Sequence, residues 1–217
     1  NPNVQWESQK QANIGFDASI MDQRISLIVD VYHKKTEDML VPGDVPIISG
    51  FSDIYKPFVN AGEIVNKGVE LTVTSHNFKG DFNWDTDFNI SFNKNEVLSL
   101  NDTIPLPRGS VGFNQDLARI QTGYPVDVFY GYVTDGIFQD QAEVDAHAAQ
   151  VPGPDPYLRT SAGDIRYMDL NSDGIIDDAD RTYIGNPNPD FIFSMNNHFE
   201  YKGFDLNIFI QGVYGVD

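Results

Sequence analysis

The sequence predicts an all-β protein: an antiparallel, up-and-down segment of a transmembrane β-barrel with long extracellular loops. Three features indicate this fold class. Apolar and polar residues alternate with a period of two, the strands are long, and short turns alternate with long polar connections. The composition agrees, because the 217 residues include 25 Asp and 18 Asn, and both residue types form helices poorly.

Six segments show the period-two alternation: 10–20, 25–34, 67–75, 82–93, 191–199 and 204–213. The clearest is 82–93, where every residue of one face, from Asn83 to Asn93, is polar. A helix would scatter these residues around its axis, so the segment is a strand with one apolar face and one wet face. The segment 124–133 is aromatic-rich. Together these segments predict about seven strands.

The predicted strands and their connections favour a barrel. The strands have roughly 9–12 residues, whereas globular strands average about 5–6 and about 9–11 cross a bilayer when tilted. Three connections are tight, at 21–24, 77–80 and 200–203, and three are long and polar, at about 35–62, 95–122 and 134–189. Short turns on one side and long loops on the other are typical of outer-membrane barrels. A soluble β-sandwich with elaborated loops is the alternative.

The two faces of each strand then receive different solvents. In a barrel, the apolar series would face lipid, and the Asn, Asp and Ser series would line a watery lumen. Five aromatic residues lie beside short turns, where an interfacial girdle is expected: Phe82, Trp84, Phe199, Tyr201 and Phe204. In a sandwich, the same residues would belong to the core or cap its edges.

The charge and the residue types exclude several classes of function. With 14 Lys+Arg against 32 Asp+Glu, the formal net charge is −18. We therefore expect neither nucleic-acid binding nor docking onto an anionic membrane surface. The chain has no Cys, which excludes disulfide scaffolds and thiolate zinc sites. No apolar run reaches the ~18 residues of a transmembrane helix.

The longest predicted loop contains a calcium-like motif at 169–180. It fits D-x-[DN]-x-[DN]-G-x₅-E, with Asp180 in place of the final Glu, and resembles a dockerin-type loop more than a helix–loop–helix sensor. Calcium takes about 6–8 oxygen ligands, and this spacing wraps them around one point. The predicted ligands of Ca²⁺ are Asp169, Asn171, Asp173, the carbonyl of Ile175, Asp177 and Asp180. A loop rich in Asx turns without metal is the alternative.

No catalytic constellation stands out in the sequence. The four His are far apart, and HExxH, GxSxG and phosphate-loop motifs are absent. Asp85 and Asp87 share a strand face, an arrangement that would suit a glycosidase pair, but an alternating polar face brings two carboxylates together in any case. We therefore expect a protein that is not an enzyme.

Short motifs along nearly the whole chain resemble, in order, those of SusC/RagA-type TonB-dependent outer-membrane transporters. The specific ones are NKGVEL at 66–71 and GDIRYxDxNxDGxIDxxD at 163–180. Looser matches lie at 1–7, 13–17, 30–36, 60–62, 92–97, 129–132, 135–139, 184–187 and 201–206. The resemblance is to the C-terminal barrel region of that family.

This resemblance implies a barrel of about 22 strands in the outer membrane of a Gram-negative bacterium. Residues 1–217 would form part of the receptor barrel, and 134–189 a long extracellular loop with the calcium-like motif. The barrel would import oligosaccharides or peptides, with a SusD-like surface lipoprotein as its lid and energy from the TonB complex. The resemblance assigns no substrate-binding residues.

The chain also departs from the family pattern. It contains no plug domain and no TonB box, and it ends at 215–217 without the terminal aromatic residue of a complete barrel. About seven strands leave open edges, whose backbone groups would be unpaired in lipid. We therefore expect a fragment of a longer importer that does not transport by itself. The alternative function is a soluble, calcium-stabilised β-sandwich that binds glycans at the cell surface.

Overall fold

The computed structural model describes residues 4–42, 58–100, 106–110, 116–150 and 159–217. Predictions that concern the remaining residues, including the motif at 1–3 and the loop segment 151–158, lie outside the described residues. The chain divides into two compact units. The first consists of Asn1–Leu106, Ile120–Val126 and Asn186–Asp217, and the second of Pro107–Arg119 and Asp127–Gly185.

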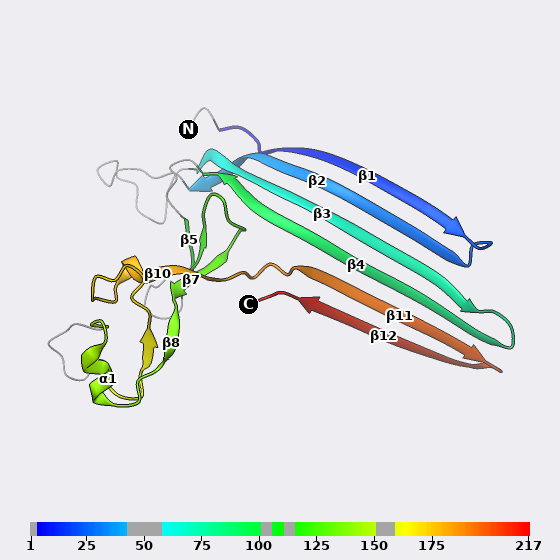
Figure 1. Cartoon of the computed structure of the whole chain (residues 1–217). Coiled ribbons are helices and arrows are strands. Elements are labelled where there is room, and N and C mark those ends of the chain that lie inside the picture. Colours follow the sequence, from blue (N-terminus) through cyan, green and yellow to red (C-terminus); the bar gives the residue numbers. More distant parts are fainter. Residues whose placement is uncertain (1–3, 43–57, 101–105, 111–115, 151–158) are drawn as a thin grey trace. The chain divides into compact units, whose positions relative to one another are not determined.

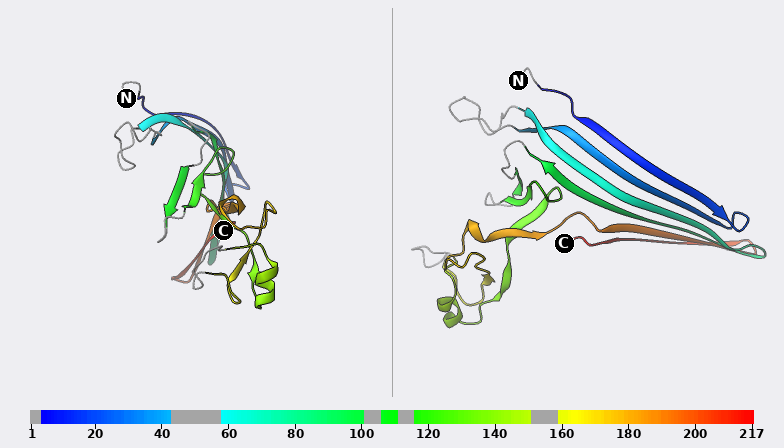
Figure 2. Two further views of the ribbon diagram at one scale, coloured as in Figure 1. Left: turned by 90° about the vertical axis from the view of Figure 1, so that its left-hand side faces the viewer. Right: turned by 45° about the horizontal axis from the view of Figure 1, so that its top comes forward.

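The first unit is a six-stranded antiparallel sheet, whose long strands lie side by side in Figure 1. Its strands are β1 (Ser8–Ile20), β2 (Ile25–Pro42), β3 (Phe58–Phe78), β4 (Phe82–Ser99), β11 (Phe191–Tyr201) and β12 (Phe204–Tyr214). Their order in the sheet is β1-β2-β3-β4-β11-β12, so each strand pairs with the next one in this unit. The sheet curves across its strands, as Figure 2 shows. This is the up-and-down order expected from the sequence.

The number and length of the strands differ from the prediction. Segment 124–133 does not join the sheet, because it forms the short strand β7 (Val128–Tyr132), which pairs with other partners. Its aromatic run lacks the regular polar alternation of the other segments, and five residues are too few to cross a bilayer. Strands β2, β3 and β4 have 18, 21 and 18 residues and extend into the predicted loops 35–62 and 95–122.

The short turns lie at one end of the sheet (Figure 1). Met21–Arg24 joins β1 to β2, and the Arg24 N–H donates to the Met21 carbonyl at 3.1 Å. Lys202 and Gly203 join β11 to β12 with φ values of 49° and 86°, the two positive values that a type I′ turn requires. The β3–β4 turn lies at 79–81 rather than 77–80, because the register shifts between His76 and Phe78 and places Asn77 in a bulge.

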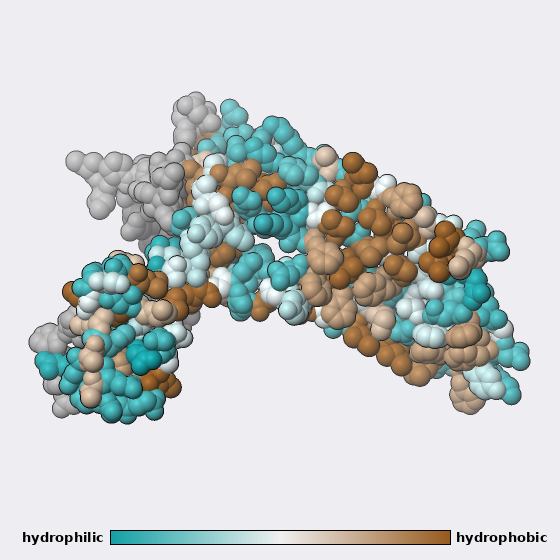
Figure 3. Space-filling view, in the orientation of Figure 1, coloured by the Kyte–Doolittle hydropathy of each residue, from teal (hydrophilic) through white to brown (hydrophobic). Residues whose placement is uncertain are grey.

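One face of the sheet is apolar across all six strands. Residues paired in register share a face, and one continuous row contains Phe16, Val29, Leu71, Ile90 and Phe193. Figure 3 shows the resulting hydrophobic band, with hydrophilic residues toward both ends of the strands. Phe16 is 60% exposed, whereas a sandwich would bury this face in its core. The apolar band therefore favours the barrel wall over the sandwich.

The second unit is made of short elements. Its four-stranded sheet has the order β10-β7-β6-β5, and β8 pairs with β9. These elements are β5 (Leu106–Ser110), β6 (Asp116–Ile120), β8 (Thr134–Ile137), α1 (Gln141–Ala146), β9 (Ile165–Tyr167), the 3₁₀ helix η2 (Asp178–Asp180) and β10 (Arg181–Gly185). Phe138 is 1% exposed and packs edge-on against His147 at 5.2 Å. Among the described helices, none has the length and apolarity to cross a membrane.

Candidate functional site

The face opposite the apolar band is polar and acidic. Asp30 of β2 is in register with Gly15 on one side and with Glu70 on the other, so two carboxylates lie on neighbouring strands. The same face contains Asp17, Asp85, Asp87, Glu200 and Asp205. This is the face that the sequence assigns to the lumen, and we call it the inner wall.

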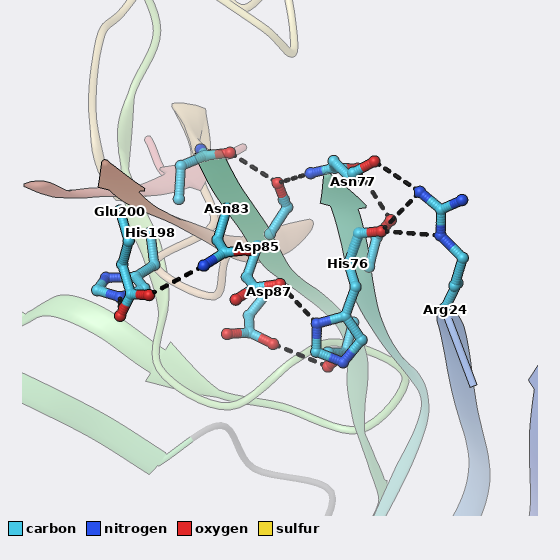
Figure 4. Close-up of polar contacts among 12 residues, drawn as sticks. Arg24, His76, Asn77, Asn83, Asp85, Asp87, His198 and Glu200 are labelled. Carbon is cyan, nitrogen blue, oxygen red and sulfur yellow. Dashed lines mark hydrogen bonds and ion pairs between the residues drawn. The ribbon is translucent and has the colours of Figure 1, made fainter. Parts of the chain in front are cut away.

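Near the short turns, carboxylates of the inner wall bind side chains on neighbouring strands (Figure 4). His76 Nδ1 lies 2.5 Å from Asp85 Oδ1, and Thr74 Oγ1 donates to Asp87 Oδ1 at 2.8 Å. Asp85 and Asp87 therefore have separate partners on β3 and do not face each other across a space for a sugar. Glu200 accepts from Asn83 Nδ2 on β4 at 3.3 Å, and His198 Nε2, on the same strand as Glu200, lies 3.1 Å from Glu200 Oε1. These contacts belong to a wall and not to a glycosidase site.

Asn77, in the bulge of β3, takes part in a series of hydrogen bonds between polar groups on the apolar face. The Arg24 guanidinium donates to the Asn77 carbonyl at 2.8 Å, and Asn77 Nδ2 donates to Thr86 Oγ1 at 2.7 Å. Thr86 Oγ1 and Trp84 Nε1 both donate to Asn197 Oδ1, at 2.8 and 3.0 Å. Polar groups on this face are thus bonded to one another, which lowers the cost of placing them against an apolar environment.

The aromatic residues predicted to form a girdle lie together on this face. Trp84 stacks on Phe199 with ring centroids 5.5 Å apart, and Phe82 stacks on Phe199 at 6.3 Å. Phe78, which the sequence analysis did not include, joins the cluster at 5.9 Å from Trp84. Tyr201 and Phe204 are paired in register beside the last turn. The cluster occupies the short-turn edge of the apolar band.

A groove of about 690 Å³ lies near the other end of the sheet. Tyr32, Asn93 and Asn95 line it from the strands, and Asn188 and Asp190 line it from the segment that precedes β11. An aromatic ring beside amides and a carboxylate can stack on a ligand and hydrogen-bond to it. This groove is not apparent from the sequence, because its walls come from segments about a hundred positions apart.

Gly68 shapes one wall of the groove. A Cβ at this position would lie 2.5 Å from Tyr32 Cζ and 2.4 Å from the Phe92 carbonyl oxygen. The Tyr32 ring can therefore occupy the space next to Gly68, where its hydroxyl donates to Asn93 Oδ1 at 3.0 Å. A glycine between polar positions of a strand, in register with an aromatic residue, is the signal that could have pointed to this groove.

The opposite wall of the groove is fixed by a chain of amides. Asn188 Nδ2 donates to the Val126 carbonyl at 3.0 Å, and the Val126 N–H donates to Asn95 Oδ1 at 2.8 Å. Asn95 Nδ2 in turn donates to Asn66 Oδ1 at 2.9 Å. These bonds tie the segment before β11 to β4 and β3, so the groove belongs entirely to the first unit.

The loop 169–180 in the second unit folds around its own carboxylates. Asp169 accepts N–H groups from Ser172 at 2.6 Å and from Gly174 at 2.8 Å. Asp173 accepts the Ile175 N–H at 2.9 Å. The Asp177 side chain caps η2 by accepting the Ala179 N–H at 2.8 Å. These hydrogen bonds hold the loop backbone in a compact turn.

Asp180 is the centre of this loop. Its side chain is fully buried and accepts the N–H groups of Leu170 and Asp177, each at 2.9 Å. The hydrogen bond from Asp177, followed by those from Leu170 and Asn171, lowers the pKa of Asp180 below its ordinary value. The sequence predicts that Asp180 closes a metal shell; the structure shows that its carboxylate holds the two ends of the loop together.

The donor set of this loop fits a hard cation. All predicted ligands offer oxygen. Asp169 Oδ1 and Asp180 Oδ1 each accept two N–H groups, whereas Asp169 Oδ2 accepts one and retains a second lone pair. In the described part of the chain, no group of three or more His, Cys, Asp or Glu residues is arranged so that it could hold a metal ion. Calcium binding at Asp169, Asn171, Asp173, Ile175, Asp177 and Asp180 therefore stays a prediction.

Comparisons with known proteins decide the family. A family model described as "TonB dependent receptor-like, beta-barrel" matches residues 1–171. TonB-dependent receptor P3 of Formosa agariphila is 37% identical over 219 aligned residues, which include 99% of this chain and 21% of that protein. The chain belongs to the TonB-dependent receptor family. Its sheet is accordingly a segment of a receptor β-barrel, and receptors of this family are transporters rather than enzymes.

The SusC/RagA branch of the TonB-dependent receptors is also represented. SusC of Bacteroides thetaiotaomicron is 25% identical over 97% of this chain and 20% of its own length. The structure of the RagAB peptide transporter superposes with a TM-score of 0.73 over 100% of this chain and 22% of that chain, at 24% identity. The chain thus spans about a fifth of the length of these receptors. The expected family and fold class are confirmed.

Proposed function

We propose that this segment forms barrel wall, lumen lining and an extracellular loop of an outer-membrane importer energised by TonB. The observation that supports this most strongly is the two-faced sheet of the first unit. On β4, outward apolar positions run from Phe82 to Phe92, opposite a polar inner series. This length matches the ~9–11 residues that cross a bilayer when tilted, and an acidic inner wall suits a water-filled lumen.

The imported molecule is an oligosaccharide or a peptide. The inner wall offers carboxylates, amides and Tyr32, and the groove beside Gly68 adds one aromatic surface. Such groups hydrogen-bond and stack on either class of ligand. The likeness to the RagAB peptide transporter supports a peptide.

The partners follow from the same likeness. A SusD-like surface lipoprotein would cover the extracellular side, and the TonB complex would act through parts of the receptor outside this segment. The long segment between β4 and β11 includes the second unit. It contains the predicted extracellular loop, so it is the part of the chain that we expect to contact the lipoprotein. Calcium bound at 169–180 would order this loop before it engages its partner, which reduces the entropy cost of binding.

Single-cysteine labelling tests the membrane arrangement. The segment has no Cys, so Gln141→Cys in α1 and Lys79→Cys in the β3–β4 turn each give one thiol in a full-length receptor freed of other Cys. A membrane-impermeant maleimide added to intact cells should label Gln141→Cys, and it should label Lys79→Cys only after lysis. Equal labelling of both positions in intact cells would contradict the proposed wall.

Uptake tests the import function directly. Cells with the full-length receptor should accumulate fluorescent peptides or fluorescent oligosaccharides, and a protonophore that removes the energy for TonB should abolish the accumulation. The matched control is the same strain without the receptor gene. If the strain with the receptor took up no more of either ligand class than the strain without it, the proposed import function would be excluded for those ligands.

A further inference from the structure

A row of basic side chains crosses the sheet at the long-loop edge of the apolar band. His33 on β2 is in register with Lys67 on β3, and Lys67 is in register with Lys94 on β4. All three residues are exposed. Alternation along each strand places them on the same face as the apolar row next to them, which contains Val31, Val69 and Phe92. We call His33, Lys67 and Lys94 the basic row.

Among the residues that the structure describes, none forms an ion pair with Lys67 or Lys94, in contrast to the next row outward. There, Lys10 pairs with Glu37, and Lys35 lies 2.9 Å from both Glu37 and Glu63. Neither Lys67 nor Lys94 forms an ion pair with any residue that the structure describes. Like charges directly opposite each other on antiparallel strands repel, so Lys67 and Lys94 favour an anion between them.

The row lies where the headgroup of a lipid would be. On β4, Lys94 is the next outward position after Phe92, the last outward aromatic residue of the apolar band. Side chains of neighbouring strands are about 4.8 Å apart, so the row covers about 10 Å along the edge of the band. Lysine ammonium groups bind phosphate as point charges, and the His33 ring supplies a further N–H donor.

We propose that the basic row binds a phosphate-bearing headgroup of a lipid in the outer leaflet, and this inference rests on the proposed location of the sheet in the outer membrane. The net charge of −18 argued against docking onto an anionic surface. Cross-strand register changes that expectation locally, because it places Lys67 and Lys94, which form no ion pair with a described residue, side by side at the edge of the apolar band. The acyl chains of the same lipid would lie along the apolar band below the row.

The test uses the purified full-length receptor in detergent and three probes: diphosphoryl lipid A, the same lipid after removal of its phosphates, and inorganic phosphate. The variant is Lys67→Gln with Lys94→Gln. The control is Lys79→Gln with Lys202→Gln, which removes the same charge from short turns at the opposite end of the sheet. Lys67→Arg with Lys94→Arg keeps the charge and reports on side-chain replacement alone. Native mass spectrometry and lipid titration give the affinity.

We expect wild type, the short-turn control and the Arg variant to bind diphosphoryl lipid A alike. The Gln variant should bind it about thirtyfold more weakly, since each lysine near an anionic lipid surface contributes roughly a factor of five. The dephosphorylated lipid should bind wild type as weakly as diphosphoryl lipid A binds the Gln variant. An unchanged melting temperature of the Gln variant without lipid would show that the variant is folded. If the variant does not fold, the single substitution Lys94→Gln is tested in its place.

Two results would overturn the inference. The first is equal retention of diphosphoryl lipid A by wild type and the Gln variant. The second is displacement of the lipid by inorganic phosphate at matched concentration, which would indicate a site for free phosphate. Failure of the cysteine-labelling test would instead contradict the membrane location itself, so the two failures are distinguishable.

Discussion

Single residues fix the local geometry of both units, Gly68 because it has no side chain and Asp180 because its carboxylate accepts backbone N–H groups. Gly68 leaves out a side chain, and Tyr32 lies in the space that results. Substitution there would displace Tyr32 or the Phe92 carbonyl and disturb the groove. Asp180 acts in the opposite way, because its buried carboxylate accepts N–H groups from both ends of its loop. A loop that is already closed in this manner loses less entropy when a cation binds.

The calcium prediction belongs to this residue scale. In wild type, calcium at a hundred times its Kd should slow proteolysis of 164–185 by up to about a hundredfold, because binding removes the open state. Asp169→Ala with Asp173→Ala removes two predicted ligands and should abolish this protection, measured on the full-length receptor with calcium and with chelator. Asp178→Ala is the matched control, since the exposed Asp178 side chain is not a predicted ligand. Cleavage of wild type that is independent of calcium would refute the site.

At the scale of elements, each hairpin of the six-stranded sheet has one apolar face and one polar face. Register places the apolar members of neighbouring strands in common rows, so every strand contributes to one band and one wall. The aromatic cluster around Trp84 and Phe199 closes the band near the short turns, and the basic row closes it at the other edge. These two borders define the depth at which the sheet would sit in a bilayer.

Substitutions at two adjacent residues of β1 should differ in the size of their effect on stability, and this difference tests the assignment of the two faces of the sheet. Phe16 lies in the middle of the apolar series of β1, from Ala12 to Ile20, and Asp17 lies on the inner wall. Phe16→Arg should destabilise the folded receptor by about 2–4 kcal/mol, the cost of a cation on the lipid face near the bilayer midplane. Asp17→Arg should have a much smaller effect. Urea titration of the full-length receptor in vesicles, followed by gel mobility, measures both, and equal effects would contradict the assignment of faces.

At the scale of the whole molecule, the second unit is an excursion from a continuous sheet. Strand β4 pairs directly with β11 from Phe82–Tyr201 to Ser91–Ile192, although about ninety positions separate them along the chain. The two ends of the excursion are also tied within the first unit, since Asn188 Nδ2 donates to the Val126 carbonyl. The sheet therefore contains the contacts that join β4 to β11.

Removal of the excursion tests this independence. A full-length receptor in which a short Gly-Ser linker replaces 127–185 should still fold into the membrane, because the bonds that align β11 with β4 belong to the first unit. Gel mobility and labelling of Lys79→Cys after lysis report folding. The same receptor should lose binding to the SusD-like lipoprotein in a co-purification assay. Failure to fold would show that the second unit contributes to the barrel wall.

The sequence by itself determined the fold class, the family and the two faces of the wall. Alternation with a period of two is a local property, so Phe82–Asn93 predicts a two-faced strand without knowledge of its neighbours. The hairpin turn at Lys202 and Gly203 was readable for the same reason. Segment 124–133 was assigned wrongly to the wall, because aromatic content raises strand propensity without saying which sheet a strand joins.

Tertiary structure alone decided how residues distant in the sequence meet. Register between β2, β3 and β4 aligned His33, Lys67 and Lys94 in one row, and a shift of one residue would have moved Lys67 to the other face. The groove next to Gly68 likewise required β2 to lie beside β3 and the segment before β11 to return to β4. Alternation fixes a strand's faces from sequence, but the pairing that sets a strand's neighbours depends on hydrogen bonds between distant segments.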